Sequence, residues 1–197
     1  MSNNKTLPLV VAITGASGVI YGVELLRVLR DLGQETHLIL SEAAGATLAS
    51  ETDHSVEDVK ALASVAYNNK DLGAAVASGS FRTRGMIVAP CTVKTLSGIA
   101  NSFTYNLVIR AADVTLKERR PLVLMVRETP LHKGHLELMS RVTDYGGVIL
   151  PPMPAFYHGP QSVMDIVHHS LGKALDQVGI EHALFERWGG DQTRSQR

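Results

Sequence analysis

Cysteine, aromatic residues and net charge are all scarce in this chain of 197 residues. Cys91 is its one cysteine, so an intramolecular disulfide is impossible and a cysteine-based zinc site is disfavoured. Aromatic residues make up 5%, and 19 Lys and Arg residues balance 19 Asp and Glu residues. A nucleic-acid binder normally shows a basic excess and aromatic side chains that stack on bases. We therefore expect no nucleic-acid partner.

Long hydrophobic runs are also absent. The apolar run 7–13 is far shorter than the ~20 residues that cross a bilayer, and Gly15 follows it too soon for a signal-peptide core. The sequence therefore predicts a cytoplasmic protein without membrane association, and the unpaired cysteine fits a reducing compartment. The length favours a single domain over residues 1–189, with a disordered tail over 190–197.

Short apolar strands alternate with helical patterns along the chain. Runs such as Leu9–Ile13 are apolar throughout, which is typical of strands buried on both faces of a parallel sheet. Ser41 and Ser55 are placed to cap helices, the second together with Asp58. The alternation predicts an α/β fold with a doubly wound, mostly parallel sheet in three layers. The expected strands cover 9–13, 35–40, 85–89, 122–126 and 147–150, the expected helices cover 19–32, 42–50, 92–100, 106–118, 131–144 and 162–178, and 68–80 is expected to be a loop.

Polar and glycine-rich residues cluster where the predicted strands end, and ligands of such folds bind at that edge of the sheet. The turn Thr14–Gly18 either lets an anionic ligand approach the backbone or serves only as a tight turn. It matches neither the dinucleotide fingerprint nor the P-loop. The segment Cys91–Thr95 likewise either binds a phosphate or only caps a helix. Cys91 itself is expected to be a buried small hydrophobe rather than a nucleophile.

Charged side chains gather near two further predicted elements. Arg110, Asp113 and Lys117 share one helix face, and their spacing alone indicates ion pairs exposed to solvent. Residues 127–128 should project at the carboxyl end of a strand, beside the other candidates. This position favours a functional role for the charged set.

Two more segments have no clear chemistry of their own. His132 and His135 have the spacing of two metal ligands, but no third ligand follows at a known spacing, so no metal site is predicted. The proline-rich loop 151–157 either covers an apolar ligand or packs on the core.

Several segments of the chain match one family pattern. They are T-G-A-S-G at 14–18, S-E-A-A at 41–44, E-T-D at 51–53, A-P-C-T-V-K-T-L-S-G-I-A at 89–100, N-L-V-I-R-A-A-D-V-T-L-K-E-R-R-P-L-V-L at 106–124, R-E-T-P-L at 127–131, P-P-M-P-A-F-Y at 151–157 and R-W-G at 187–189. Together they resemble the UbiX-like flavin prenyltransferases, over nearly the whole chain. The loop 151–157 and I-V-H-H at 166–169 are similar to the branch of this family that is paired with phenolic or hydroxyarylic acid decarboxylases.

The resemblance implies a homododecamer of flavodoxin-like, or Rossmann-like, subunits that binds FMN at subunit interfaces. Such enzymes join a dimethylallyl group from dimethylallyl phosphate to N5 and then C6 of reduced FMN. The product, prenylated FMN, passes to a UbiD-type decarboxylase. The family needs no metal ion.

The resemblance also implies roles for the matching residues. Those that match catalytic positions are Ser17, Glu51, Lys117 and Glu128, with Ser17 and Glu51 working together near flavin N5. Those that match substrate-binding positions are Lys117, Arg127, Glu128, Tyr157, Lys173 and Trp188. Those that match flavin-binding positions are Gly15, Ala16, Ser17, Ser41, Thr92, Val93, Lys94, Thr95, Arg110 and Arg127.

The chain departs from the family pattern at two places. Lys173 stands where the family usually has Arg, which keeps the charge but loses the bidentate fork. The stretch His132–Gly134 replaces a more usual Ser-containing one.

Two alternative functions stay open. The Lys173 change leaves open a carrier protein that binds FMN for a decarboxylase without prenyl transfer. Another is an FMN-dependent cysteine decarboxylase of the same fold, although that relative uses a histidine soon after the first turn and residues 17–34 contain none.

Overall fold

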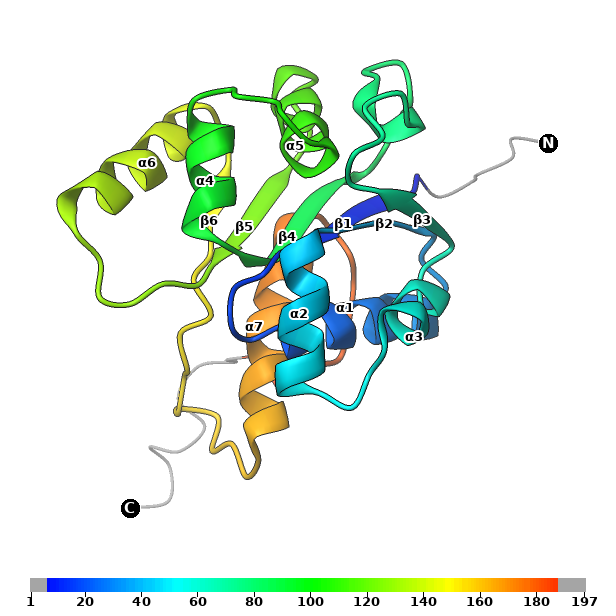
Figure 1. The fold of residues 1–197 in the computed structure, drawn as a ribbon. Helices are drawn as coiled ribbons and strands as arrows, with labels where there is room; N and C mark the ends of the chain where they lie inside the picture. Colours follow the sequence, from blue (N-terminus) through cyan, green and yellow to red (C-terminus); the bar gives the residue numbers. More distant parts are fainter. Residues whose placement is uncertain (1–6, 188–197) are drawn as a thin grey trace.

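A parallel sheet of six strands forms the middle layer of the fold (Figure 1). The computed structural model describes residues 7–187. The strands lie in the order β3-β2-β1-β4-β5-β6, so β1 and β4 are neighbours although β2 and β3 separate them along the chain. The strands are β1 Leu9–Ile13, β2 Thr36–Leu40, β3 Val65–Asn68, β4 Gly85–Cys91, β5 Leu122–Val126 and β6 Val148–Ile149.

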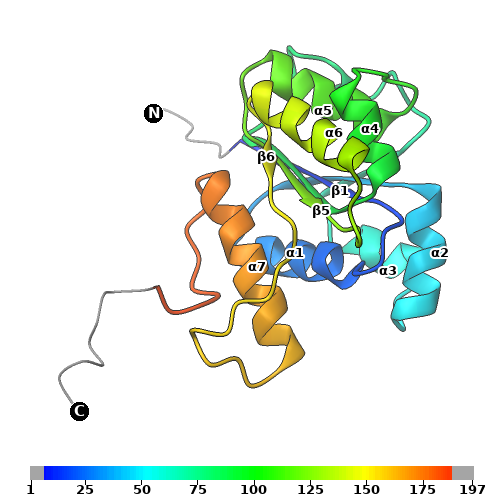
Figure 2. The same ribbon diagram turned by 90° about the vertical axis from the view of Figure 1, so that its left-hand side faces the viewer.

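Helices cover both faces of the sheet. Helices α4, α5 and α6 lie on one side, and α1, α2, α3 and α7 lie on the other (Figure 1, Figure 2). This is the doubly wound, three-layer α/β arrangement that the sequence predicts, so the predicted fold class is confirmed. The helices are α1 Ile20–Asp31, α2 Glu42–Glu51, α3 Val56–Ala61, α4 Val93–Ala100, α5 Leu107–Lys117, α6 Lys133–Asp144 and α7 Val163–Gln177, with a short 3-10 turn, η1, at Ala75–Ala77.

Alternate residues of β1 face the two helical layers. Leu9, Val11 and Ile13 pack into the apolar cluster that includes α1, α2 and α7. Val10 and Ala12 pack into the cluster that includes α4 and α5. Because both faces of the strand are buried, every position is apolar and the usual alternation of apolar and polar residues is missing.

Side-chain caps fix the starts of the helices at the edge of the sheet where the candidate site lies. The hydroxyl of Ser41 accepts a backbone hydrogen bond at the start of α2, and Thr92 does the same for α4. Ser55 and Asp58 form the predicted capping box ahead of α3. Each cap satisfies an N–H group that the first turn of a helix leaves without a partner.

The structure departs from the predicted elements at two places. Strand β4 does not stop at Ala89 but runs through Pro90 to Cys91. Its pairing with β5 shifts register at this point, and a proline, which has no N–H to donate, is tolerated at such an irregularity. The second departure is β3, which the sequence pattern does not predict. Within residues 7–187 this edge strand pairs with β2 alone, and it is largely exposed, so it lacks the apolar run of the central strands.

A crevice opens where the order of the strands reverses. From β1 the chain proceeds to β2 on one side, and from β4 it proceeds to β5 on the other. The loops that leave the carboxyl ends of β1 and β4 therefore diverge, and this is the place where doubly wound sheets bind ligands.

The described residues bear on two further predictions. Among residues 7–187, no helix has both the length and the hydropathy that crossing a membrane requires. Trp188, a predicted substrate-binding residue, and the predicted tail over 190–197 lie outside the described residues.

Candidate functional site

Thr14 ties the ends of β1 and β4 together at the crevice. Its hydroxyl donates to the carbonyl of Pro90 at 2.7 Å and accepts from the N–H of Thr92 at 2.9 Å. Thr14 is buried, so water does not compete for these bonds. The two loops that carry most of the candidate flavin-binding residues are thereby held side by side.

The turn after β1 packs closely against α2. A Cβ atom on Gly15 would lie 2.5 Å from the Cβ of Ala43, so a larger residue there would displace the helix. Gly18 has a φ of 90°, a conformation that L side chains rarely adopt. Ala16 is buried whereas Ser17 is exposed, so Ser17 is the side chain of this turn that a ligand can reach.

A cavity of about 370 Å³ opens between this turn and the N-termini of two helices. Ser41 caps α2 on one side and Thr92 caps α4 on the other. The N–H groups and the dipole at each helix start favour an anion. Five predicted flavin-binding residues lie among the lining residues, which are Thr14, Gly15, Ser41, Glu42, Ala43, Asn69, Lys70, Thr92, Lys94, Thr95, Tyr105 and Asn106.

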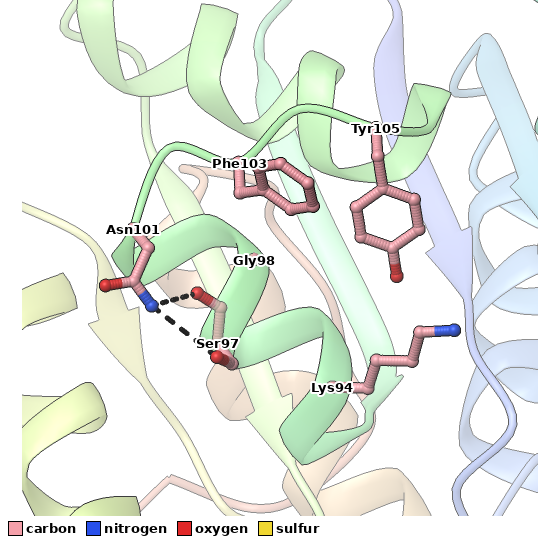
Figure 3. Close-up of a pocket in the computed structure, with 6 residues that line it drawn as sticks. All are labelled: Lys94, Ser97, Gly98, Asn101, Phe103 and Tyr105. Atoms are coloured by element: carbon pink, nitrogen blue, oxygen red, sulfur yellow. Dashed lines mark hydrogen bonds between the residues drawn. The ribbon is translucent and has the colours of Figure 1, made fainter.

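A second hollow of about 490 Å³ adjoins the first on the outer side of α4 (Figure 3). The rings of Phe103 and Tyr105, whose centres are 5.5 Å apart, reach over α4 from the loop after it. The Nζ of Lys94 lies 5.5 Å from the centre of the Tyr105 ring. Lys94 and Tyr105 line both hollows, and the second is completed by Ser97, Gly98, Asn101 and Phe103.

Glu51, the last residue of α2, reaches back to the glycine turn. Its Oε2 accepts from the backbone N–H of Gly18 at 2.8 Å and of Val19 at 3.1 Å. The Ser17 hydroxyl also hydrogen-bonds to this carboxylate. Partial burial acts to raise the pKa of Glu51, but these hydrogen bonds and the charge of Arg127 outweigh it and hold the pKa below its usual value. The carboxylate is therefore ionised at neutral pH.

Arg127 and Glu128 follow the end of β5 at the same edge of the sheet. The N–H of Arg127 donates to the carbonyl of Cys91 at 3.1 Å. Oε1 of Glu128 accepts from the N–H of Thr129 at 2.9 Å, and the side chains of Arg127 and Glu128 are exposed. The structure thus brings Arg127 within electrostatic range of Glu51, at one end of the crevice.

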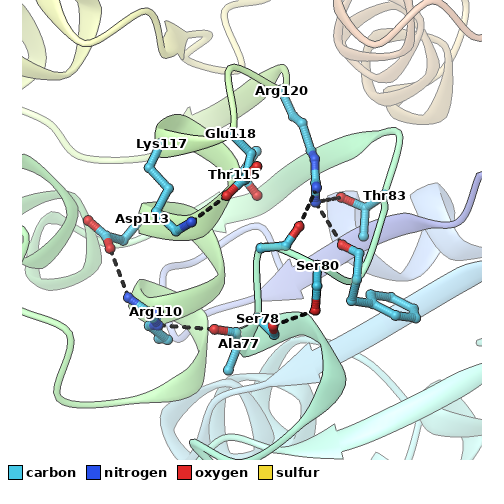
Figure 4. Close-up of polar contacts among 12 residues, drawn as sticks. Ala77, Ser78, Ser80, Thr83, Arg110, Asp113, Thr115, Lys117, Glu118 and Arg120 are labelled. Carbon is cyan, nitrogen blue, oxygen red and sulfur yellow. Dashed lines mark hydrogen bonds and ion pairs between the residues drawn. The ribbon is translucent and has the colours of Figure 1, made fainter.

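Arg110 and Lys117 lie apart from this group, within a polar network beside α5 (Figure 4). Arg110 forms the ion pair with Asp113 that their spacing indicates, at 3.2 Å. Lys117 pairs with the adjacent Glu118. Lys117 ends α5 shortly before β5 begins, whereas Arg127 follows β5. Lys117 therefore lies near the edge of the sheet where the strands begin, and Arg127 lies at the opposite edge, where the strands end.

Tyr157 and Lys173 form a third group, with α7. The Tyr157 hydroxyl lies 2.8 Å from Nε2 of His169. Lys173, one helical turn beyond His169, is exposed, and its Nζ lies 4.0 Å from Asp176. Helix α7 packs against α1, on the opposite face of the sheet from α5 (Figure 2). The predicted site residues thus occupy three places on one subunit.

Two further sets of side chains have structural roles. The rings of His132 and His135 lie 3.6 Å apart, and Nδ1 of His132 accepts from the N–H of Gly134 to cap α6. No group of three or more metal-ligating side chains occurs within the described part of the chain. Cys91 is fully buried, and burial raises the pKa of its thiol, so the expectation of a buried small hydrophobe is confirmed.

Sequence reasoning missed two polar residues that line the first cavity, Asn69 and Lys70. Asn69 accepts from the N–H of Val108 at 3.1 Å through its side chain and so fixes the start of α5, which Asn106 caps. Lys70 forms an ion pair with Glu42 at 2.5 Å. Asn69 and Lys70 directly follow β3, so recognition of that edge strand would have placed both at the ligand-binding edge of the sheet.

Comparison with known proteins agrees with this geometry. Residues 1–174 match the model of the Flavoprotein family. The flavin prenyltransferase UbiX of Thauera aromatica is 55% identical over 94% of this chain and 96% of that protein. The crystal structure of AnUbiX in complex with FMN and dimethylallyl pyrophosphate has a TM-score of 0.93 and 48% identity, over 94% of this chain and 99% of that one. A dodecameric FMN-dependent UbiX-like decarboxylase from Escherichia coli O157:H7 has a TM-score of 0.91 and 50% identity, over 93% of this chain and 100% of that one.

A shared fold alone does not identify an activity, because many functions occur on doubly wound sheets. Here about half of the aligned residues are identical, and the alignments cover more than nine-tenths of the chain. The chain belongs to the Flavoprotein family and, within it, to the UbiX-like flavin prenyltransferases.

Proposed function

We propose that this chain transfers the dimethylallyl group of dimethylallyl phosphate to N5 and C6 of reduced FMN and so makes prenylated FMN. The observation that carries the proposal is the 55% identity to a flavin prenyltransferase over 94% of the chain. The complex of the similar AnUbiX with FMN and dimethylallyl pyrophosphate supports the same two classes of ligand here.

The first cavity suits the phosphate end of FMN. It presents two helix N-termini and Lys94 to one space, which is the chemistry that binds a phosphate monoester. The glycine turn beside it allows the close approach of a flat ring to the backbone. The bound, reduced flavin supplies the nucleophile of the reaction. The proposed flavin-binding residues are Gly15, Ala16, Ser17, Ser41, Thr92, Val93, Lys94, Thr95, Arg110 and Arg127.

Ser17 and Glu51 are suited to move a proton. When a ring carbon forms a new bond, the proton on that carbon must leave, and an ionised carboxylate can accept it. Glu51 is ionised at neutral pH, and the hydrogen bonds from the glycine turn favour this form by holding its pKa below the usual value. The Ser17 hydroxyl, bonded to the same carboxylate, provides a route for the proton.

Cationic side chains take the part that a metal ion plays in other reactions that release phosphate. Negative charge develops on the leaving oxygen as the allylic C–O bond breaks, and fixed positive groups stabilise it. We propose Lys117, Arg127 and Lys173 as these groups. Glu128, an anion, is proposed to belong to the charged set around the phosphate. Tyr157 contacts the phosphate, and its ring stabilises the developing allyl cation.

These groups meet only when subunits assemble. Lys117 and Arg127 lie at opposite edges of one sheet, and Tyr157 lies beside α7. Ser17 and Glu51 are exposed in the single chain, which leaves space for a neighbouring subunit. We therefore propose a homododecamer with FMN at subunit interfaces. The dodecameric structure of the similar UbiX-like protein supports this assembly.

The product defines the partner. Prenylated FMN must leave the site to act elsewhere, and the proposed recipient is a UbiD-type decarboxylase.

The buried, unpaired thiol of Cys91 fits the proposed location in the reducing cytoplasm. Residues 1–189 are proposed to form the single flavin-binding domain of this protein.

Two other functions make different predictions. An FMN-dependent cysteine decarboxylase would release carbon dioxide from a peptidyl cysteine, but residues 17–34 contain no histidine for that chemistry. A carrier protein would bind FMN and leave it unchanged. Lys117, Arg127 and Glu128 would then have no reaction to serve.

One experiment separates the three functions. The protein is incubated with reduced FMN and dimethylallyl phosphate, and the released flavin is analysed by mass spectrometry. We expect a flavin heavier by one dimethylallyl group, formed equally well in EDTA, and no such product from FAD. Unchanged FMN would support the carrier, and decarboxylation of a cysteine peptide would support the third function. A parallel reaction with the pyrophosphate identifies the preferred donor.

A further inference from the structure

His169 connects an exposed phenol to the buried side of α7. The Tyr157 hydroxyl lies 2.8 Å from Nε2 of His169, which is a hydrogen bond of ordinary length. Tyr157 is 60% exposed and His169 is 7% exposed. The ring of Tyr157 therefore stands at the surface while its oxygen is held from within the subunit.

Three rings from two segments surround the His169 imidazole. His158, in the loop before α7, stacks on it with 4.7 Å between ring centres and 8° between ring planes. Phe185, in the segment after α7, lies at 4.7 Å, and Tyr157 meets the ring edge-on at 5.6 Å. A ring packed on several sides cannot turn without moving its neighbours, so the position of Nε2 is fixed.

The surroundings of His169 also favour its neutral form. Burial lowers the pKa of its imidazole, and the nearby His158 and Lys173 act in the same direction. A neutral imidazole has one donor and one acceptor nitrogen. With its proton on Nε2, the ring donates to the oxygen of Tyr157, and the phenolic O–H then acts as a donor toward acceptors such as a phosphate oxygen.

We propose that His169 is a positioning residue for the allyl phosphate. His169 and Lys173 are four residues apart in α7 and therefore lie on the same helix face. By holding the Tyr157 hydroxyl, His169 places it on the same side of α7 as Lys173. The two groups then meet one phosphate from a rigid support. This inference rests on the proposed function, because it assigns to Tyr157 and Lys173 the phosphate of the allylic donor.

The test measures binding without turnover. Dimethylallyl phosphate is titrated by calorimetry into protein that holds oxidised FMN, which lacks the electrons for the reaction. His169→Phe keeps a ring but removes the hydrogen bond, and we expect the Kd for dimethylallyl phosphate to rise about 3- to 10-fold. His169→Gln retains a hydrogen-bonding group and should recover most of the affinity. The Kd for FMN should stay the same in both variants, and kcat with reduced FMN should change less than KM.

A double variant tests whether His169 acts through Tyr157. Tyr157→Phe alone should weaken dimethylallyl phosphate binding at least as much as His169→Phe, and the two together should add little. Equal affinity of wild type and His169→Phe, or full additivity in the double variant, would overturn the inference. If thermal unfolding shows that His169→Phe has lost its fold, His169→Gln decides, since the inference requires it to bind more tightly than Tyr157→Phe. A wild-type protein that binds no dimethylallyl phosphate would instead refute the proposed function.

Discussion

The carboxylate of Glu51 accepts a hydrogen bond from the backbone N–H of Gly18 at 2.8 Å, so the last residue of α2 fixes the turn that leaves β1. The same carboxylate accepts a hydrogen bond from the hydroxyl of Ser17. One side chain therefore serves both the local fold and the proposed proton transfer. A useful substitution must keep the first role and remove the second.

Glu51→Gln meets this requirement. Its carbonyl oxygen can still accept from Gly18, but an amide cannot take up a proton at neutral pH. We expect turnover to fall by roughly two decades, since positioned acid–base groups typically contribute that much or more. Binding of FMN should change little. Single-turnover spectra with reduced FMN and an FMN titration check these two expectations.

The matched control for this variant is Glu57→Gln. Glu57 is an exposed carboxylate on α3 that pairs with Lys60 at 2.7 Å, and its loss should leave both measurements unchanged. Wild-type turnover in the Glu51→Gln protein would remove Glu51 from the catalytic residues.

Lys173→Arg restores the residue that the family usually has. The Lys173 side chain is 51% exposed and lies 4.0 Å from Asp176, so space for a longer cation is available. A guanidinium can bond a phosphate with two parallel N–H groups. We expect the Kd for dimethylallyl phosphate to stay level or to tighten up to about fivefold, which one net hydrogen bond of about 1 kcal/mol would give.

Calorimetry checks this expectation, with Lys133→Arg on the exposed face of α6 as the control. A complete loss of binding in Lys173→Arg would show that the pocket is shaped for lysine. The assignment of Lys173 to the phosphate would then be wrong.

The parts of the fold that the sequence predicts well are those with local causes. The apolar run of β1 indicates a strand buried on both faces. Ser41 predicts the start of a helix, because its side chain caps a backbone N–H group three residues further along. Strand β3 has no such signal, because an exposed edge strand is held by backbone pairing with β2 and needs few apolar side chains. Asn69 and Lys70 were missed for the same reason.

The candidate site depends on contacts that spacing cannot reveal. Ser17 and Glu51 are far apart in the chain, and only the packing of α2 against the glycine turn brings them together. The family resemblance pairs them, whereas periodicity and composition do not. Lys117 shows the opposite case: its helix face is predictable, but the proposed contact with a site at the other edge of the sheet needs a second subunit.

Asp176 should give the stability of the protein an acid-sensitive component. Its carboxylate accepts from Arg187 at 2.6 Å and 3.1 Å and lies 3.2 Å from Nε2 of His182. The hydrogen bond with Arg187 is the main cause of the lowered pKa of Asp176. A pKa lower in the folded than in the unfolded protein stabilises the fold above the unfolded value of about 3.9, and this gain disappears as the pH falls through the folded value.

We therefore expect Asp176→Asn to lower the unfolding midpoint at pH 7 and to have a smaller effect at pH 3, which lies below the unfolded value. The cost at pH 7 should be at most about 1 kcal/mol, because Arg187 is exposed and solvent screens the pair. Thermal unfolding at the two pH values measures it, with the exposed Asp144→Asn as control. A midpoint difference that is as large at the lower pH as at pH 7 would exclude the ionised pair as its cause.

Subunits that carry Lys117→Ala and subunits that carry Glu51→Gln should complement each other. The structure places Lys117 and Glu51 at opposite edges of the sheet, so a site that uses both takes them from different subunits. Alone, Lys117→Ala should lose roughly 3 kcal/mol of transition-state stabilisation, or about two decades in rate, because one fixed charge at the leaving group is gone. In a mixed oligomer, a site is intact when the subunit that supplies Glu51 carries Lys117→Ala and the neighbour that supplies Lys117 carries Glu51→Gln. With equal mixing each condition holds for half of the sites, so roughly a quarter of the sites are intact. Coexpression with two affinity tags, purification on both and a prenylation assay measure this recovery, and separately purified variants mixed afterwards are the control. Activity no higher than that of the control would mean that Lys117 does not reach the site of a neighbouring subunit.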